Sequence, residues 1–203
     1  MRVNATYSRL NKAKADFVAV ASAMTAADLN QQDPSTGQTG LHLAVQRGVL
    51  KDLPAHLVTE IGLAIGDKNG RTPLHDLKTN WSSIPKSALT EAVLLKENAY
   101  GEIPLHLAAC AGNLNLVPSR ILTLDNLLLE DQDGWNSLRY AEKHGNLKQI
   151  PALQQQSILK MSPEEKKSWF VALTAFMDKS SELCLALGAD MSHCEQKGAW
   201  QEL

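Results

Sequence analysis

The sequence is poor in aromatic residues and in cysteine. Phe, Trp and Tyr make up 5% of the 203 residues while 44% are hydrophobic, so the core must consist mainly of Leu, Ile, Val and Ala. Such side chains suit closely stacked helices better than a β-sandwich, and we expect an all-α fold. The three cysteines, Cys110, Cys184 and Cys194, are too few for a disulfide-stapled secreted domain. This favours a reducing, cytoplasmic compartment and leaves export into a host cell open.

The sequence also lacks an excess of either charge and any long apolar run. Its 20 Lys and Arg residues nearly balance 22 Asp and Glu, and the cations do not cluster densely enough to neutralise a phosphate backbone. No stretch approaches the roughly 18 apolar residues that a membrane span needs. Residues 17–24 are apolar but short and preceded by Asp16, which argues against a signal peptide. We expect no nucleic-acid partner and no membrane association.

Sequence patterns of catalysis are missing. There is no Gly-rich phosphate loop, no Gly-x-Ser-x-Gly element and no carboxylate pair marked by spacing. Cys110 and Cys184 stand among apolar residues and read as small core side chains. His106 with Cys110, and His193 with Cys194, do not match the ligand spacing of a zinc module. We therefore expect no enzyme activity, no cofactor and no metal site.

What the sequence does contain is a set of three signals that recur with nearly one period. The first is a glycine turn that leads into a helix start, with Leu41, Leu74, Leu105 and Leu138 spaced by 33, 31 and 33 residues. The second is an apolar residue before a proline, at Pro54, Pro85, Pro118 and Pro151, with steps of 31, 33 and 33 residues. Self-similarity at such a period indicates a repeat architecture.

The third signal is a threonine between two apolar residues. It occurs at Thr25, Thr59, Thr90 and Thr123. Each threonine is placed to cap the N-terminus of a short helix, and its flanking apolar pair is placed as a hydrophobic staple. A unit of about 33 residues cannot bury its apolar face alone, so neighbouring units must stack and share one core.

The Thr-Pro-Leu-His element at residues 72–75, its relatives at 41–44 and 105–109, the glycines at 48, 112 and 145 and the period together resemble the ankyrin repeat family. The resemblance covers roughly residues 33–150. It implies a helical solenoid of about four repeats, with turns that project as fingers and first helices that line a concave face used for protein recognition. We expect His42, His75 and His106 to tie one repeat to the next through both ring nitrogens, rather than to carry protons or a metal.

Three departures from the family pattern carry predictions. Each proline lies inside the second helix and should split it, because proline lacks an N–H and forces its predecessor out of the α region. The repeat at 74–85 is two residues shorter and has Asn80 and Trp81 in place of its glycine, which predicts a shortened first helix. Arg139 replaces the histidine of the last repeat, so that position should lack the histidine's hydrogen bonds.

The domain organisation follows from the position of the repeats. We expect a single domain over residues 1–203, with an N-terminal cap helix and partial repeat at 1–32, four repeats at 33–160, and C-terminal capping helices with a degenerate half-repeat at 161–203. The N-terminal helix is predicted from the helical spacing of Leu10, Ala13, Phe17, Val20, Ala21 and Met24. The C-terminal helix is predicted to open at the capping box of residues 162–165. We expect a monomer.

The register that the resemblance implies selects surface residues for partner contact. The candidates lie on the fingers, at the ends of the first helices and at the shortened repeat: Gln46, Arg47, Arg71, Trp81, Tyr100, Glu102, Trp135, Lys143 and His144. Tyr100 and Trp135 have the composition of interface hot spots, although each ring could equally lie on its neighbouring finger.

The most direct functional prediction is a scaffold that binds another protein without a cofactor. An alternative is a regulatory or targeting segment of a larger enzyme or of a secreted bacterial effector. A third is a purely structural spacer. Partner contact through Tyr100 and Trp135 would separate the first from the third, because a spacer needs those rings only for stability.

Overall fold

The computed structural model describes residues 5–77 and 81–146, and these residues form helices and turns with no strand among them. This confirms the all-α expectation for that part of the chain. The contacts within the chain group residues 1–146 into one compact unit and residues 147–203 into another. The predictions for Pro151, for the helix opening at Ser162 and for the half-repeat that ends at Leu203 lie outside the described residues.

The helices are short. The α-helices are α1 (Ala5–Lys12), α2 (Phe17–Ser22), α3 (Ala26–Leu29), α4 (Gly40–Gln46), α5 (Glu60–Ala64), α6 (Glu91–Leu94), α7 (Pro104–Cys110), α8 (Leu124–Leu127) and α9 (Ser137–Lys143). The 3-10 helices are η1 (Lys14–Asp16), η2 (Leu50–Asp52), η3 (Ala55–Leu57), η4 (Pro73–Asp76), η5 (Trp81–Ser83), η6 (Lys86–Ala88) and η7 (Leu114–Leu116).

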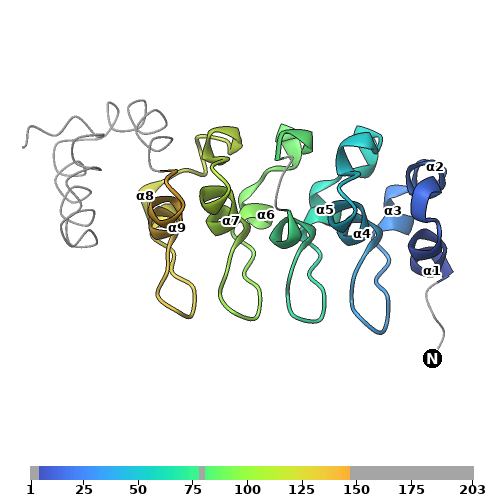
Figure 1. Cartoon of the computed structure of the whole chain (residues 1–203), viewed down its shortest axis with the longest axis horizontal. Coiled ribbons are helices and arrows are strands. Elements are labelled where there is room, and N and C mark those ends of the chain that lie inside the picture. The colour runs from blue at the N-terminus through green and yellow to red at the C-terminus, as the bar shows by residue number, and fades with distance from the viewer. Residues whose placement is uncertain (1–4, 78–80, 147–203) are drawn as a thin grey trace, which may run out of the picture. The chain divides into compact units, whose positions relative to one another are not determined.

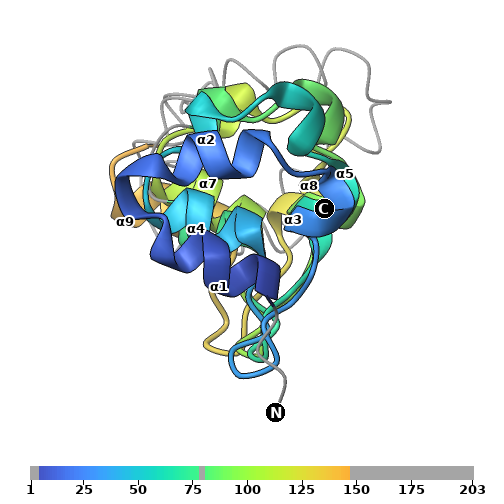
Figure 2. The same cartoon turned by 90° about the vertical axis from the view of Figure 1, so that its right-hand side faces the viewer.

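One order of elements recurs along residues 33–146. A finger loop leads into a first helix, a broken second segment follows, and, except after α9, a short third helix precedes the next finger. The finger loops comprise residues 33–38, 67–71, 98–102 and 131–135, and all four project to the same side in Figure 1. Viewed along the row, they nearly superpose (Figure 2). Successive units therefore stack in one orientation, with α4 against η4, α5 against α6, and α7 against α9.

The core of the stack comes from the repeated leucines. Leu41, Leu74, Leu105 and Leu138 of the first helices are buried, as are Leu29, Leu63, Leu94 and Leu127 of the third helices. Full burial of a leucine side chain contributes roughly 2 kcal/mol by the hydrophobic effect. Because each unit supplies the same two positions, the apolar core continues from one unit to the next.

The broken second segment confirms the prediction made from the prolines. The chain turns to an extended conformation at Leu53, with ψ of 143°, and at Val117, with ψ of 135°, in each case directly before proline. Short 3-10 turns replace a continuous helix on both sides of Pro54 and Pro85. The shortened first helix is confirmed as well, since η4 has four residues where α4 and α7 each have seven.

The N-terminal prediction of one amphipathic helix is wrong in its continuity. The chain forms α1 and α2, joined through η1, and the two helices lie one above the other in Figure 2. Tyr7 and Leu10 of α1 and Phe17 of α2 are all buried. The apolar spacing stays helical across the turn, so the pattern does not show where the chain folds back, and three of its six residues, Ala13, Val20 and Met24, are only half-buried.

The threonine caps are confirmed at three of four positions. Thr25, Thr59 and Thr123 each accept a hydrogen bond from a backbone N–H three residues later, at 3.1, 3.1 and 3.2 Å. The prediction is wrong for the side chain of Thr90, although α6 still begins after it. Its hydroxyl donates instead to Oε1 of Glu60, at 2.8 Å, across to α5.

Candidate functional site

Each finger loop is closed from within by the side chain at its start. In the second finger, Oδ1 of Asp67 accepts hydrogen bonds from the backbone N–H groups of Asn69 and Arg71, at 2.8 and 3.0 Å. Asn98 and Asp131 bind the backbone of their own loops in the same way. Short polar side chains at these positions mimic a backbone turn. In the second, third and fourth fingers the loop conformation therefore does not depend on the side chains at the tip.

Neighbouring fingers are joined by backbone hydrogen bonds. Lys68 donates to the carbonyl of Thr36 at 3.1 Å, Ala99 to that of Asn69 at 2.8 Å, and Gln132 to that of Tyr100 at 3.0 Å. The glycine of the second finger permits this approach: Gly70 has a φ of +72°, and a Cβ there would lie 3.1 Å from the Cα of Asn98. The fingers thus form one connected row.

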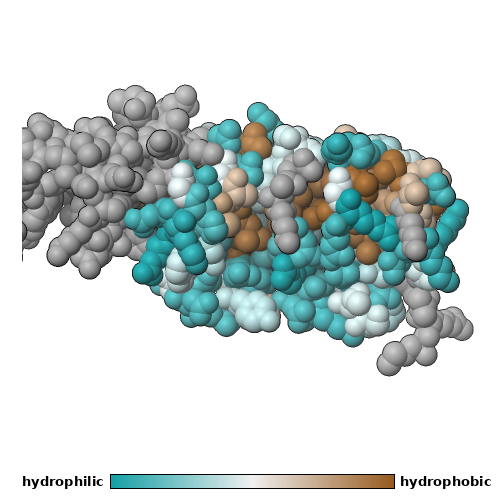
Figure 3. Space-filling view, viewed as in Figure 1, coloured by the Kyte–Doolittle hydropathy of each residue, from teal (hydrophilic) through white to brown (hydrophobic). Residues whose placement is uncertain are grey.

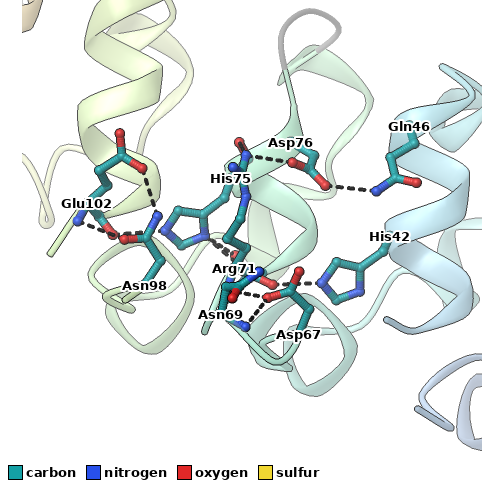
Figure 4. Close-up of polar contacts among 10 residues, drawn as sticks. His42, Gln46, Asp67, Asn69, Arg71, His75, Asp76, Asn98 and Glu102 are labelled. Carbon is teal, nitrogen blue, oxygen red and sulfur yellow. Dashed lines mark hydrogen bonds and ion pairs between the residues drawn. The ribbon is translucent and has the colours of Figure 1, made fainter. Parts of the chain in front are cut away.

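The first two histidines of the repeated motif link consecutive units, as the sequence predicts. Nδ1 of His42 accepts from the N–H of Thr39 at 3.0 Å, and its Nε2 donates to the carbonyl of Arg71 at 2.8 Å. His75 makes the same pair of bonds, with Thr72 at 2.9 Å and with the carbonyl of Glu102 at 2.9 Å (Figure 4). Each ring thereby connects the start of its own first helix to the base of the next finger.

The third histidine differs from the first two in the partner of its Nε2 atom. Nε2 of His106 donates to the carbonyl of Leu129 at 2.7 Å, and its ring stacks on Tyr140 of α9 with centroids 5.4 Å apart. Burial lowers the pKa of His42, His75 and His106 below the ordinary value, so the neutral ring is favoured in each. The neutral state matches geometry in which one nitrogen accepts and the other donates.

A polar chain crosses from α4 to the second unit on the side of the first helices. Arg71 forms an ion pair with Asp76, with Nη2 to Oδ1 at 2.7 Å, and also donates to the carbonyl of His75 at 3.1 Å. Nε2 of Gln46 donates to the other carboxylate oxygen of Asp76 at 3.0 Å (Figure 4). Two predicted contact residues, Gln46 and Arg71, thus meet on an aspartate that the prediction did not include.

The side chain of Arg47 binds the N-terminal helices. Its guanidinium donates to the carbonyl of Leu10 at 3.0 Å and to that of Asn11 at 2.7 Å, and it lies 4.8 Å from the ring centroid of Phe17. These contacts hold the end of α4 against α1 and α2. The observed contacts of this predicted partner residue are therefore structural.

Trp81 requires a correction, because it is 1% exposed and cannot offer its ring to a partner. It stands three residues before Ile84, just as Leu50 and Leu114 stand three residues before their own pre-proline positions. All three side chains are buried. The tryptophan therefore occupies a core position of the shortened unit, where its volume fills space that the other units fill differently.

Trp135 lies on side chains of its own unit rather than on the neighbouring finger. Its ring centroid is 5.5 Å from that of Tyr140, and the Nζ of Lys143 lies 4.4 Å from the centroid. The guanidinium carbon of Arg139 lies 5.5 Å from it. Tyr140 in turn donates its hydroxyl to Oδ2 of Asp131, at 2.7 Å. Trp135 and Lys143, two predicted contact residues, are thus brought together.

The remaining predicted residues lie at the finger row and at the end of α9. Tyr100 is 59% exposed, whereas Glu102 accepts at 2.7 Å from Nδ2 of Asn98 within its own finger. His144 is exposed directly after α9. The finger side is mostly hydrophilic in Figure 3, and hydrophobic side chains gather over the helices. Tyr100 is therefore an exception to its surroundings.

The prediction missed Asp76 and Tyr140, and one signal could have found them. Both stand two residues after the repeated leucine, where the other units have Leu43 and Leu107. A polar or aromatic residue at a position that is otherwise leucine marks a departure that the shared fold does not require. Arg139, which replaces the histidine, also departs: Asn136 caps α9 there, accepting from the N–H of Leu138 and of Arg139 at 3.1 Å each.

Within residues 5–77 and 81–146, no three His, Cys, Asp or Glu side chains come together as metal ligands would. Cys110 is half-buried, and burial raises the pKa of its thiol. No helix in the same part of the chain is long and apolar enough to cross a membrane.

No protein-family model matches the chain, and no curated protein matches it in a sequence search.

Proposed function

We propose that this chain is an ankyrin-like solenoid of about four repeats that binds another protein through its finger loops and first helices. We name this surface the recognition face; it comprises the four finger loops, the exposed side chains of α4 and α9, and the half-buried side chains of η4 and α7. It acts by binding alone, as a monomer, and needs no enzyme activity and no cofactor.

The state of Tyr100 is the single observation that carries this proposal. Its backbone N–H donates to Oδ1 of Asn98 at 2.8 Å, and its carbonyl accepts from Gln132 at 3.0 Å. The backbone is thus fully used by the finger row, while the side chain is 59% exposed. A large amphipathic ring on a fixed backbone gives contact area at a small cost in conformational entropy, which favours an interface.

The rigidity of the recognition face supports the same function. From the second finger onward, histidine links, internally closed turns and finger-to-finger bonds fix the loop backbones without using the side chains at the tips. Residues such as Lys68, Asn69 and Tyr100 are exposed on that frame. A preordered surface loses less entropy on binding than a mobile loop does.

Site-specific photo-crosslinking tests the proposal. A photoreactive amino acid replaces Tyr100 in one variant and Ile61, which is 72% exposed on α5 outside the recognition face, in a matched control. In extracts of cells that express the chain, we expect the variant at position 100 to give a discrete protein adduct and the variant at position 61 to give none. Equal labelling from both positions, or no adduct at position 100, would contradict the proposal.

A substitution then separates binding from stability. Tyr100→Ala should change the free energy of unfolding by less than about 0.5 kcal/mol, because the ring is exposed. It should weaken binding of the crosslinked partner by about tenfold or more, as expected for a hot spot. Loss of fold instead would assign Tyr100 a structural role.

A further inference from the structure

The fourth finger and α9 carry a surface cluster without a counterpart in the other units. The cluster, named here the Trp135 cluster, consists of Trp135, Arg139, Tyr140 and Lys143. The residues equivalent to Trp135 are Gln38, Arg71 and Glu102, and those equivalent to Tyr140 are Leu43, Asp76 and Leu107. Because the other units fold without aromatic residues at these positions, the fold alone does not account for them.

The aromatic part of the cluster is held in place from the inside. Tyr140 is fixed at both ends, by its hydroxyl on Oδ2 of Asp131 at 2.7 Å and by stacking on the buried His106 with an interplanar angle of 25°. Trp135 then leans on Tyr140 at an angle of 54°. The three rings form a continuous series from the core to the surface, so Trp135 is ordered before any partner arrives.

The Lys143 ammonium of the cluster pairs with no carboxylate among the described residues. Lys143 is exposed and packs on Trp135 at 4.4 Å, and within the described residues no ion pair joins it to a carboxylate. The carboxylate of Asp131, to which Tyr140 of the cluster donates, turns inward, because its two oxygens accept from backbone N–H groups and from Tyr140. Two other acids are nearby in sequence: Asp133 is at the finger tip, and Glu142 is adjacent to Lys143, a spacing that does not place side chains face to face on a helix.

The second unit shows the contrasting arrangement. Arg71, equivalent in position to Trp135, is already paired with Asp76 at 2.7 Å, and that carboxylate also accepts from Gln46. The polar groups there satisfy one another. At the fourth finger the Lys143 ammonium packs on the ring of Trp135 but pairs with no carboxylate from the described part of the chain.

We infer that the Trp135 cluster anchors a protein segment that presents an Asp or Glu carboxylate beside an apolar side chain. The carboxylate accepts hydrogen bonds from the Lys143 ammonium, and the apolar side chain packs against the ring of Trp135. This inference rests on the proposed protein-binding function and specifies its partner. The cluster contains two cations and no row of them, so it matches one carboxylate better than a nucleic-acid backbone.

Peptide selection on the full chain tests the inference. Random twelve-residue peptides displayed on phage are selected against the immobilised protein, and the enriched sequences should carry an acidic residue next to an aromatic or aliphatic one. Binding of the strongest enriched peptide, fluorescently labelled, is then followed by anisotropy. Lys143→Glu should weaken it by about tenfold or more, as loss of a charged hot spot does.

Two controls keep the result specific. Lys68→Glu makes the same charge change at an exposed site on another finger, and it should alter the affinity by less than about twofold. A peptide whose acidic residue is replaced by lysine should bind the Lys143→Glu variant and not the original protein. Such a reversal shows that the variant is folded and that the two charges meet.

Several outcomes would overturn the inference. Enrichment of basic or neutral peptides, no enrichment, an equal effect of Lys68→Glu, or a failed charge reversal would each do so. If the enriched peptides do not bind in solution and the protein elutes as a dimer in size-exclusion chromatography, the occupant of the cluster is a second copy of the chain. If crosslinking at position 100 still yields a partner, only this inference fails; if it yields none, the proposed function fails too.

Discussion

The second and third units of the stack have first helices of different length, yet both are linked to the next unit. The short unit, which starts at the 67–71 finger, has the four-residue η4 as its first helix, whereas the long unit, which starts at the 98–102 finger, has the seven-residue α7. Both nevertheless donate a histidine bond outward and join the finger row. The link between units is therefore carried by the helix start and the finger, and not by the length of the helix.

The short unit has a shorter first helix but a larger buried side chain than the long unit. Trp81 and Leu114 occupy equivalent positions, and each is 1% exposed. The indole N–H of Trp81 has no hydrogen-bond partner within the part of the chain that the structure describes. A buried unsatisfied donor costs roughly 1–3 kcal/mol, so the burial of the ring must outweigh that cost. Packing volume, rather than polar pairing, explains the tryptophan.

The largest expected effect comes from removing that volume. Trp81→Ala should lower the free energy of unfolding by about 3–5 kcal/mol, and Trp81→Leu, which installs the residue of the long unit, by about 2 kcal/mol, because a cavity remains. Urea denaturation followed by circular dichroism measures both. A Trp81→Leu variant as stable as the original protein would mean that the short unit does not need the larger side chain.

The pH dependence of the free energy of unfolding tests whether the histidine links of the two units are equivalent. His75 and His106 have folded-state pKa values below the unfolded value of about 6.5, so the unfolded chain binds protons first as pH falls. Their stabilising contribution is full above that pH and is lost as the pH falls through the folded-state pKa. The slope is up to about 1.4 kcal/mol per pH unit for each histidine.

His75→Gln and His106→Gln, measured by urea denaturation between pH 7.5 and 5, should each flatten this slope, because the pKa of each ring is lowered in the folded state. The carboxyl groups of Asp33 and Asp131 have lowered pKa values and so respond only at more acidic pH, outside this window. His42→Gln makes the same change in the first unit and should flatten the slope too, because burial also lowers the pKa of His42. Flattening by one variant alone would show that only one of the two links depends on a neutral ring.

The sequence predicts those features that local backbone chemistry determines. The prolines divide the second segment, the missing residues shorten η4, and the histidines make their links, because each effect follows from one residue type at one position. The side chains of the site were harder to predict. The sequence alone selects Arg47 and Trp81 as contacts, but Arg47 binds the α1 backbone and Trp81 is buried.

These misses have a common physical cause. The role of a long side chain depends on which distant groups come within its reach, and the repeat period does not specify that. Arg47 meets Leu10 because α1 packs against α4, and the helical spacing conceals the turn between α1 and α2. Trp81 is buried because the short unit leaves room for it. Both depend on packing between elements rather than on any pattern within one element.

The smallest expected effect tests whether the third helices of the two units are capped alike. Thr123 of the long unit caps α8, so Thr123→Ala should cost about 1 kcal/mol. Thr90 of the short unit binds Glu60 instead, and loss of that exposed hydrogen bond should cost only about 0.5 kcal/mol. In a Glu60→Ala background the Thr90 hydroxyl is released to cap α6, so Thr90→Ala should then cost as much as Thr123→Ala. Thermal denaturation of this double-mutant cycle measures the difference, and an unchanged cost would show that the backbone before α6, rather than Glu60, prevents the cap.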